Sequence, residues 1–300
     1  MKFGWLNIDK PCGMSSGKVV HKVKKMLGVK AGHAGTLDPL ATGVLPIAFG
    51  EATKTTMYAT DTVKVYEVTV KWGEQRDTDD AEGEVVCSSS VRPDEQSIRD
   101  AIQGYIGVVQ QVPATFSAIR VGGTRAYSLS RKGKDIELAP RSVCILSIEF
   151  VSMDRERGTA DFVVTCKKGV YIRALARDLG ITLGCLGYVL KLRRTRVGPF
   201  TEHGALTLQR LEELSAEGRV SEAVLPINIF MDGITNIEVD ESVGNSIRNG
   251  RSIRLRDIAS NGLCVEENYD MCYLSQAGGV PVAVCAVVDG TARPVRVFNV

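Results

Sequence analysis

The segment from residue 31 to residue 50, AGHAGTLDPLATGVLPIAFG, constrains the fold of this chain more than any other stretch. Its first half shows neither the helical period of about 3.6 residues nor the alternation of a half-buried strand, so we expect a loop. Asp38 stands before Pro39, which restricts the aspartate to an extended backbone. The loop also holds glycines that permit close approach to a ligand: Gly32, Gly35 and Gly43.

Asp38 is the carboxylate of this loop, and its sequence neighbours are mostly apolar. An Asp-Pro pair by itself is usually a turn former. Held among Leu37, Pro39 and Leu40, the carboxylate would be partly desolvated, as a nucleophile or general base requires. A phosphate-binding P-loop fits poorly, because the chain contains no G-x-x-x-x-G-K-S/T sequence.

Regular secondary structure is expected on both sides of this loop. Helical spacing with a cap at each end predicts a helix between Ser15 and Gly28, and Asp94 suits the N-cap of a second helix. A third helix is predicted over residues 171–180. The acidic stretch 207–223 also has a helical pattern, and a domain boundary is expected where it ends, near residues 228–236.

Strands are predicted over residues 63–72, 142–151 and 160–166. Alternation in the first of them places Tyr66, Val68, Val70 and Trp72 on one face. At the C-terminus, VAVCAVV, the turn signal Asp289-Gly290 and PVRVFNV predict a small β unit. Strands with irregularly interspersed helices indicate the α+β class.

The charge of the chain is distributed unevenly. The 300 residues include 37 Lys and Arg against 35 Asp and Glu, a net charge of +2 that by itself argues against a polyanionic partner. By position, residues 1–30 carry +6 and residues 120–200 carry +9, whereas 31–119 carry −7 and 201–300 carry −6. The two basic stretches are either solvated faces or parts of one surface for an anion such as a nucleic-acid backbone.

Cysteine usage and hydropathy indicate the compartment. The eight cysteines include no C-x-x-C pair and there are only three histidines, so no zinc site is expected. The chain has no apolar run of about 18 residues and no signal-peptide core, so no membrane span is expected. We therefore expect reduced thiols and a cytoplasmic location.

The loop at residues 31–50 resembles the signature loop of the TruB family of tRNA pseudouridine synthases. That family carries its catalytic aspartate in the pattern G-H-x-G-x-L-D-P-x-A-x-G, in which Asp38 occupies the aspartate position. Further segments are similar in the order of the family: Lys64-Val65-Tyr66, RDTDDAEG at 76–83, QVPATFSAIRVGGTRAY at 111–127, CKKGVYIRALARDLG at 166–180 and LRRTRVGPF at 192–200. Four positions depart from the family pattern: Arg76, Ala114, Phe116 and Arg120.

The resemblance implies an enzyme that isomerises the uridine at position 55 of the tRNA T-loop to pseudouridine after flipping it from the stack. It implies a mixed, largely antiparallel sheet with a central cleft in residues 1–230, and a small PUA-like RNA-binding β domain in residues 235–300. Its partner is the tRNA T-stem-loop, no metal or cofactor is implied, and a monomer is our default expectation.

The resemblance also assigns roles to residues. Asp38 is the catalytic aspartate, whose step is attack at C1′, addition at C6 or deprotonation at C2′. Tyr66 stacks on the flipped base, His33 occupies the space that the base vacates, and Tyr171 and Leu192 line the uracil pocket. Arg173 pairs with Asp38 and keeps it ionised.

Each of these residues also has an ordinary structural interpretation. A lone histidine is usually a satisfied turn or core residue, a tyrosine that opens an amphipathic helix is usually core, and an arginine is usually at the surface. Arg177, Arg193, Arg194 and the lysines of the first helix are assigned to phosphates, with a solvated face as the alternative. The acidic segment 76–83 lacks the EF-hand spacing and is interpreted as a turn.

Three functions are compatible with these residues. The first is the RNA-modifying isomerase, and the second is a non-catalytic RNA-binding or tRNA-folding protein that uses the same surfaces. The third is a metal-independent hydrolase with Asp38 as nucleophile, which would release free uracil. The presence of Asp38, Tyr66 and Arg173 together favours the isomerase.

Overall fold

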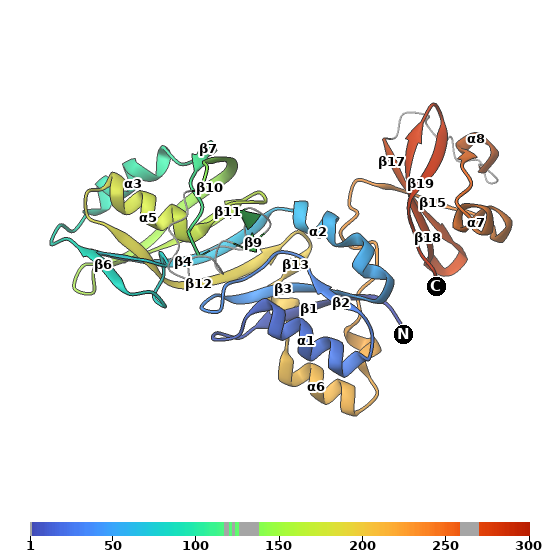
Figure 1. Ribbon diagram of the computed structural model, residues 1–300, viewed down its shortest axis with the longest axis horizontal. Coiled ribbons are helices and arrows are strands. Elements are labelled where there is room, and N and C mark those ends of the chain that lie inside the picture. Colours follow the sequence, from blue (N-terminus) through green and yellow to red (C-terminus); the bar gives the residue numbers. More distant parts are fainter. Residues whose placement is uncertain (1, 117–119, 122–123, 126–137, 259–269) are drawn as a thin grey trace.

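A ten-stranded mixed sheet organises the first three quarters of the chain (Figure 1). The computed structural model describes residues 2–116, 120–121, 124–125, 138–258 and 270–300. The main strand order is β14-β1-β3-β12-β4-β11-β10-β7, with β2 beside β3 and β13 beside β12. The strands are β1 Gly4–Lys10, β2 Ala31–His33, β3 Thr42–Phe49, β4 Lys64–Trp72, β7 Gly107–Gln111, β10 Arg141–Asp154, β11 Thr159–Cys166, β12 Gly187–Val197, β13 Phe200–Thr201 and β14 Leu206–Thr207.

Only two strand pairs of this sheet are parallel, β1 with β14 and β3 with β12. The remaining pairs are antiparallel. The predicted α+β class with a mixed, largely antiparallel sheet is therefore confirmed. Short hairpins lie outside the sheet: β5 Glu74–Arg76 with β6 Val85–Ser88, and β8 Arg120–Val121 with β9 Thr124–Arg125.

The helices begin and end where the sequence places their caps. Helix α1, Ser16–Leu27, is capped by Ser15, whose hydroxyl accepts from the Lys18 amide at 3.3 Å, and ends at Gly28 with φ 66°. Asp94 caps α3, Glu95–Gln103, in the same way. Among the described residues, this part also contains the helices α2 Thr56–Asp61, α5 Ile172–Thr182 and α6 Leu208–Ala216. Figure 1 shows α3 and α5 together at one end of the sheet and α1 and α6 near the other.

The side chains of strand β4 alternate between the two faces of the sheet. Tyr66, Val68, Val70 and Trp72 are buried on one face, as the alternation predicts. This face shares one hydrophobic core with α1 and α5. Glu67 and Thr69 lie on the opposite face, which is more exposed. Tyr66 thus lies on the helix-covered face, where a cavity near Asp38 opens.

The C-terminal residues form a second sheet, of five strands in the order β15-β17-β18-β19-β16. Asp289 and Gly290 have φ of 51° and 65° and make the predicted turn between β18 and β19. This sheet is consistent with the expected PUA-like unit. The described strands and α-helices of this C-terminal part are β15 Thr235–Glu238, α7 Glu241–Arg248, β16 Ile253–Arg254, α8 Leu255–Ile258, β17 Met271–Gln276, β18 Val280–Val288 and β19 Thr291–Val297.

A shared core connects the two sheets. Trp5 and Phe200 of the larger sheet belong to the same cluster of buried side chains as Tyr273 and Phe298 of the C-terminal part. Lys54 adds a hydrogen bond of 2.8 Å to the Val297 carbonyl.

Two further observations concern membranes and metals. Among the helices of the described residues, none combines the length and the hydrophobicity needed to span a bilayer. In the same part of the chain, no three His, Cys, Asp or Glu side chains are grouped closely enough to hold a metal ion.

Candidate active site

A cavity of about 220 Å³ lies where the Asp38 loop, the start of β4 and the start of α5 meet. Four of the predicted site residues line it together: Asp38, Tyr66, Tyr171 and Arg173. Leu192 of β12 lines it as well. His33, in β2, is not among the lining residues of this cavity. The structure therefore brings five of the six predicted residues to one place.

The Asp38 loop is tied to the N-terminal strand and helix through its backbone. The buried hydroxyl of Ser16 accepts from the Leu37 amide at 2.8 Å and donates to the Leu37 carbonyl at 2.9 Å. The buried Lys10 ammonium donates to the Pro39 carbonyl at 3.1 Å, and the Gly13 amide donates to the same oxygen at 2.8 Å. These bonds satisfy the irregular backbone on both sides of Asp38 and fix its direction.

A glycine allows the start of β3, which follows the Asp38 loop, to run close to β12. Gly43 has φ 97°, and a Cβ atom built on it would lie 2.2 Å from the Arg194 carbonyl oxygen. Both the backbone conformation and the available space therefore exclude a side chain at this position. The glycine pattern of the sequence thus reflects close backbone contact as well as flexibility.

Asp38 forms an ion pair with Arg173, whose Nε lies 2.9 Å from the Asp38 Oδ2 atom. The Arg173 side chain is 4% exposed, whereas that of Asp38 is 36% exposed, so the carboxylate is open toward the cavity. Burial raises the pKa of Asp38, and the Arg173 charge opposes that rise. The pKa of this carboxylate therefore lies above its ordinary value, and the buried Arg173 cation is the main group that limits the rise.

Arg173 is itself positioned by groups distant in sequence. It donates to the Thr78 carbonyl at 2.7 Å and to the Phe116 carbonyl at 2.8 Å. Asp80, also buried, lies 3.5 Å from Arg173. Phe116 is one of the departures from the family pattern, and the contact uses its backbone, so the lost hydroxyl does not affect it.

The acidic turn at residues 76–83 supplies two buried carboxylates that sequence reasoning missed. Asp80 faces Arg173, and Asp79 pairs with Arg177 at 3.0 Å. Burial raises the pKa of Asp79 to about 6, against the opposing charge of Arg177. The interpretation of this segment as a turn is confirmed, but the turn also neutralises two arginines of α5. The signal available in the sequence was the i, i+4 spacing of Arg173 and Arg177, together with two adjacent acids in the turn, Asp79 and Asp80.

Tyr66 is 7% exposed and presents its ring to the cavity wall. Burial raises the pKa of its hydroxyl, so the phenol is neutral. The Arg194 guanidinium lies 6.0 Å from the ring centroid, on the neighbouring strand. An aromatic face in a cavity is a suitable platform for an extruded base.

The expected phosphate contact of Arg194 is wrong. This side chain is 1% exposed, and it donates to the carbonyls of Val44 at 2.8 Å and Gly35 at 3.0 Å. Its role is to connect β12 to β3 and to the Asp38 loop. Arg177 and Arg193 are engaged in ion pairs as well, so their phosphate contacts stay predictions.

The start of α5 is held by Gln111, another residue that sequence reasoning missed. Its side-chain oxygen accepts from the Tyr171 amide at 2.9 Å, and its side-chain nitrogen donates to the Tyr171 carbonyl at 3.1 Å. Because Tyr171 is the N-cap residue of α5, this pair of bonds sets where the helix begins.

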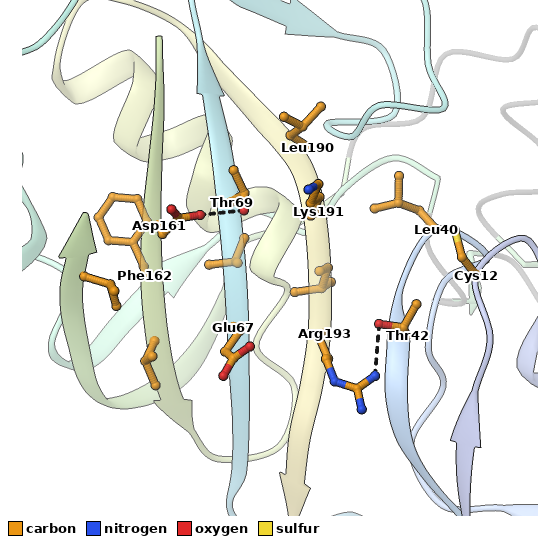
Figure 2. A pocket seen from close by; sticks show the side chains of 14 residues that line it. Cys12, Leu40, Thr42, Glu67, Thr69, Asp161, Phe162, Leu190, Lys191 and Arg193 are labelled. Atoms are coloured by element: carbon orange, nitrogen blue, oxygen red, sulfur yellow. Dashed lines mark hydrogen bonds between the residues drawn. The ribbon is translucent and has the colours of Figure 1, made fainter. Parts of the chain in front are cut away.

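A larger cavity of about 650 Å³ opens on the opposite face of the sheet (Figure 2). Figure 2 shows Glu67, Thr69, Asp161, Lys191 and Arg193 projecting from β4, β11 and β12 into it. Thr69 donates to Asp161 at 2.6 Å. Asp38 is not among the residues that line this cavity, and the lining includes both acidic and basic side chains, as an ordinary solvated sheet face does.

Two solved structures share the architecture of this chain. A crystal structure of a Cbf5–Nop10–Gar1 complex matches with a TM-score of 0.73 at 24% identity, over 99% of this chain and 84% of the other. A structure of an H/ACA RNP bound to a substrate RNA containing 2′-deoxyuridine matches with a TM-score of 0.71 at 23% identity, over 100% and 85% of the two chains. At this identity the likeness shows the fold alone.

The family follows from sequence comparison. The TruB family pseudouridylate synthase N-terminal domain matches residues 21–172, and the tRNA pseudouridylate synthase B C-terminal domain matches residues 173–231. The chain belongs to the TruB family of pseudouridylate synthases.

Relatives named tRNA pseudouridine synthase B match over the whole chain. That of Anaplasma phagocytophilum is 68% identical over 300 residues, covering 100% of both chains. That of Anaplasma marginale is 58% identical, covering 100% of this chain and 98% of the relative. That of Agrobacterium fabrum is 43% identical, covering 99% and 94%.

Proposed function

We propose that this protein is a tRNA pseudouridine synthase that isomerises the T-loop uridine at position 55 to pseudouridine. The observation that carries the proposal is the Asp38 carboxylate, which faces a cavity and is held by the buried Arg173 at 2.9 Å. Relatives that share 68% and 58% of its residues are named tRNA pseudouridine synthase B. A base must leave the stack to reach such a cavity.

In this proposal each residue of the site has its own role in binding or in the chemical step. Asp38 performs the chemical step on the sugar or the base, and Arg173 keeps it ionised and oriented. Tyr66 stacks on the flipped uracil, and Tyr171 and Leu192 close the sides of the pocket. His33 fills the space that the base leaves in the RNA. Because the product is an isomer of the substrate, the reaction needs no second substrate.

We further propose that residues 1–230 form the catalytic domain and that residues 235–300 form a PUA-like RNA-binding domain. The separate C-terminal sheet supports that division. The T-stem-loop is the proposed recognition element, the proposed working form is a monomer, and the proposed location is the cytoplasm.

Asp38→Asn tests the function. A T-stem-loop RNA is incubated with each variant, and pseudouridine is mapped by position and by mass spectrometry. We expect the wild type and a control, Asp100→Asn on the exposed face of α3, to convert the T-loop uridine. Asp38→Asn should bind the RNA and form no product.

The alternatives give different results in the same experiment. Release of free uracil by the wild type would identify a hydrolase. RNA binding by the wild type without any product would identify a non-catalytic binding protein. Turnover by Asp38→Asn would refute the assignment of Asp38.

A further inference from the structure

Lys64 opens strand β4 and lines the same cavity as Asp38 and Tyr66, although the mechanism above gives it no role. Its side chain is only 6% exposed. The ammonium donates to the carbonyls of Thr60 at 2.7 Å and Thr62 at 2.5 Å. An ammonium has three N–H donors, so these two bonds leave one donor over.

A second cation lies beside Lys64. A Cβ atom built on Gly35 would lie 3.3 Å from Arg194 Nη1 and 3.9 Å from Lys64 Cε, so both side chains pack against the same glycine. Arg194 lines the cavity too, and it donates to the backbone carbonyls of Val44 and Gly35 and to the Tyr66 hydroxyl. Within the described residues, neither side chain forms an ion pair with a carboxylate.

The cavity therefore has two charged ends. The charges that act most on Asp38 are those of Arg173, Asp80 and Lys10. Those that act most on Lys64 are Arg194, Cys166, Asp61 and Lys168. The carboxylate end is balanced by its own arginine, whereas the Tyr66 end holds two buried cations whose hydrogen bonds go to backbone carbonyls and, from Arg194, to the neutral Tyr66 hydroxyl. Buried charge without a counter-ion is costly, and such a site favours an anion that enters or forms there.

We infer that Lys64, supported by Arg194, stabilises the negative charge that develops on the uracil ring during the isomerisation. The inference rests on the proposed function and deepens it, since it names the group that receives the charge of the detached base. Lys64 stays protonated and donates its remaining N–H to a ring carbonyl oxygen. It acts on the base, while Asp38 acts at the other end of the cavity.

The electron balance of each possible Asp38 step produces this charge. When the N1–C1′ bond breaks, its electron pair stays on the ring, and C1′ gains either a bond to an Asp38 oxygen or a double bond after Asp38 removes the C2′ proton. Addition of Asp38 to C6 likewise drives an electron pair onto the O4 carbonyl. After the ring turns, C5 supplies the pair for the new bond to C1′, and an Asp38 oxygen bound at C1′ leaves with its bonding pair. The C5 proton is then lost as N1 gains one; an Asp38 oxygen bound at C6 leaves as C5=C6 re-forms, and any C2′ proton is returned.

The test compares Lys64→Met and Lys64→Arg with the wild type in single-turnover reactions on the T-stem-loop. Removing one preorganised donor from developing charge lowers rates by about 10²–10³-fold, so we expect a loss of about that size in Lys64→Met and a much smaller one in Lys64→Arg. The affinity for RNA should change by less than about threefold, since the charge forms only during reaction. The control is Lys191→Met, an exposed lysine on the opposite face of the sheet (Figure 2), which should match the wild type.

Two further readouts separate this role from a structural one. Fluorine at C5 stabilises a ring anion, so an RNA with 5-fluorouridine at the target should narrow the difference in cleavage rate between wild type and Lys64→Met. Burial lowers the pKa of Lys64 to about 8, so the wild-type rate should fall as pH rises through 8. Because Lys10 also has a pKa of about 8, the decisive observation is that Lys64→Arg moves this alkaline limb to higher pH.

Several outcomes would overturn the inference while leaving the function intact. One is a wild-type rate for Lys64→Met. Another is a loss of RNA affinity in Lys64→Met, with the salt dependence of binding reduced by the amount expected for about one phosphate contact. That result would assign Lys64 to the RNA backbone. If Lys64→Met does not fold, an alkaline limb that stays in place in Lys64→Arg refutes the inference. A wild type that forms no pseudouridine would refute the proposed function itself.

Discussion

Replacing Arg173 by lysine should change the pH dependence of the reaction, because Arg173 sets the ionisation of Asp38. Lysine keeps one charge but cannot reproduce the planar fork that reaches Asp38 and the carbonyls of Thr78 and Phe116 at once. The ion pair at 2.9 Å should therefore lengthen or be lost. Burial and the nearby Asp80 would then be opposed less strongly, so the pKa of Asp38 should rise further.

The size of the effect follows from the contact. An adjacent cation lowers the pKa of an aspartate by about 1–3 units. Since a third of the Asp38 side chain is open to the cavity, we expect the lower part of that range, a rise of about 1–2 units. The rate depends on the ionised carboxylate, so the acidic limb of the profile should move to higher pH by the same amount. At neutral pH the loss is smaller than that caused by Asp38→Asn.

The assay is single-turnover conversion of the T-stem-loop between about pH 5 and pH 9. Arg177→Lys is the matched control, because Arg177 lies one turn later on the same helix face and pairs with Asp79 and Asp178 instead of Asp38. Its acidic limb should coincide with that of the wild type. An unchanged limb in Arg173→Lys, or an equal shift in Arg177→Lys, would refute the assignment of Arg173 as the partner that ionises Asp38.

Two further predictions concern the supports of the site. Ser16→Ala should lower the unfolding free energy measured in urea by about 2–4 kcal/mol and should reduce turnover, because the Leu37 amide and carbonyl both lose their partner. Ser15→Ala removes only a helix cap, so it should lower the unfolding free energy by about 1 kcal/mol and retain turnover. Asp79 has a pKa of about 6 when folded, above its ordinary 3.8, so the folded state binds the extra proton and this group lowers stability as pH rises from 4 to 6. The difference in unfolding free energy between Asp79→Asn and the wild type should therefore grow by about 2 kcal/mol across that window, and a difference that does not vary with pH would contradict the burial of Asp79.

Local sequence determined the elements that carry the site. Caps at Ser15, Gly28 and Asp94 placed two helices correctly, because capping depends on groups three or four residues apart. Alternation in residues 63–72 placed Tyr66 on the buried face, because strand geometry alone assigns side chains to faces. The loop character of the Asp38 segment also followed from its glycines and its missing period.

Local sequence did not identify the partners of the charged side chains. The basic stretch 120–200 is interpreted from sequence either as a solvated face or as part of one surface for an anion such as a nucleic-acid backbone. In the structure, Arg193 pairs with Asp9 at 3.1 Å, Arg177 pairs with Asp79, and Arg194 donates hydrogen bonds to backbone carbonyls. The sum over a stretch of sequence does not predict surface potential, since pairing partners come from distant strands.

By itself, the sequence determined which residue types this protein places in its candidate site, through a glycine-rich Asp-Pro loop, an alternating strand and an amphipathic helix. Only the tertiary structure decided which of them meet and what each charge does. The Asp38 pair with Arg173 spans 135 positions, and the bonds that orient Arg173 come from Thr78 and Phe116. Such contacts depend on strand order and register, in which β4 lies between β11 and β12. No short-range pattern encodes that order, so the two buried cations at the Tyr66 end became visible only in the folded chain.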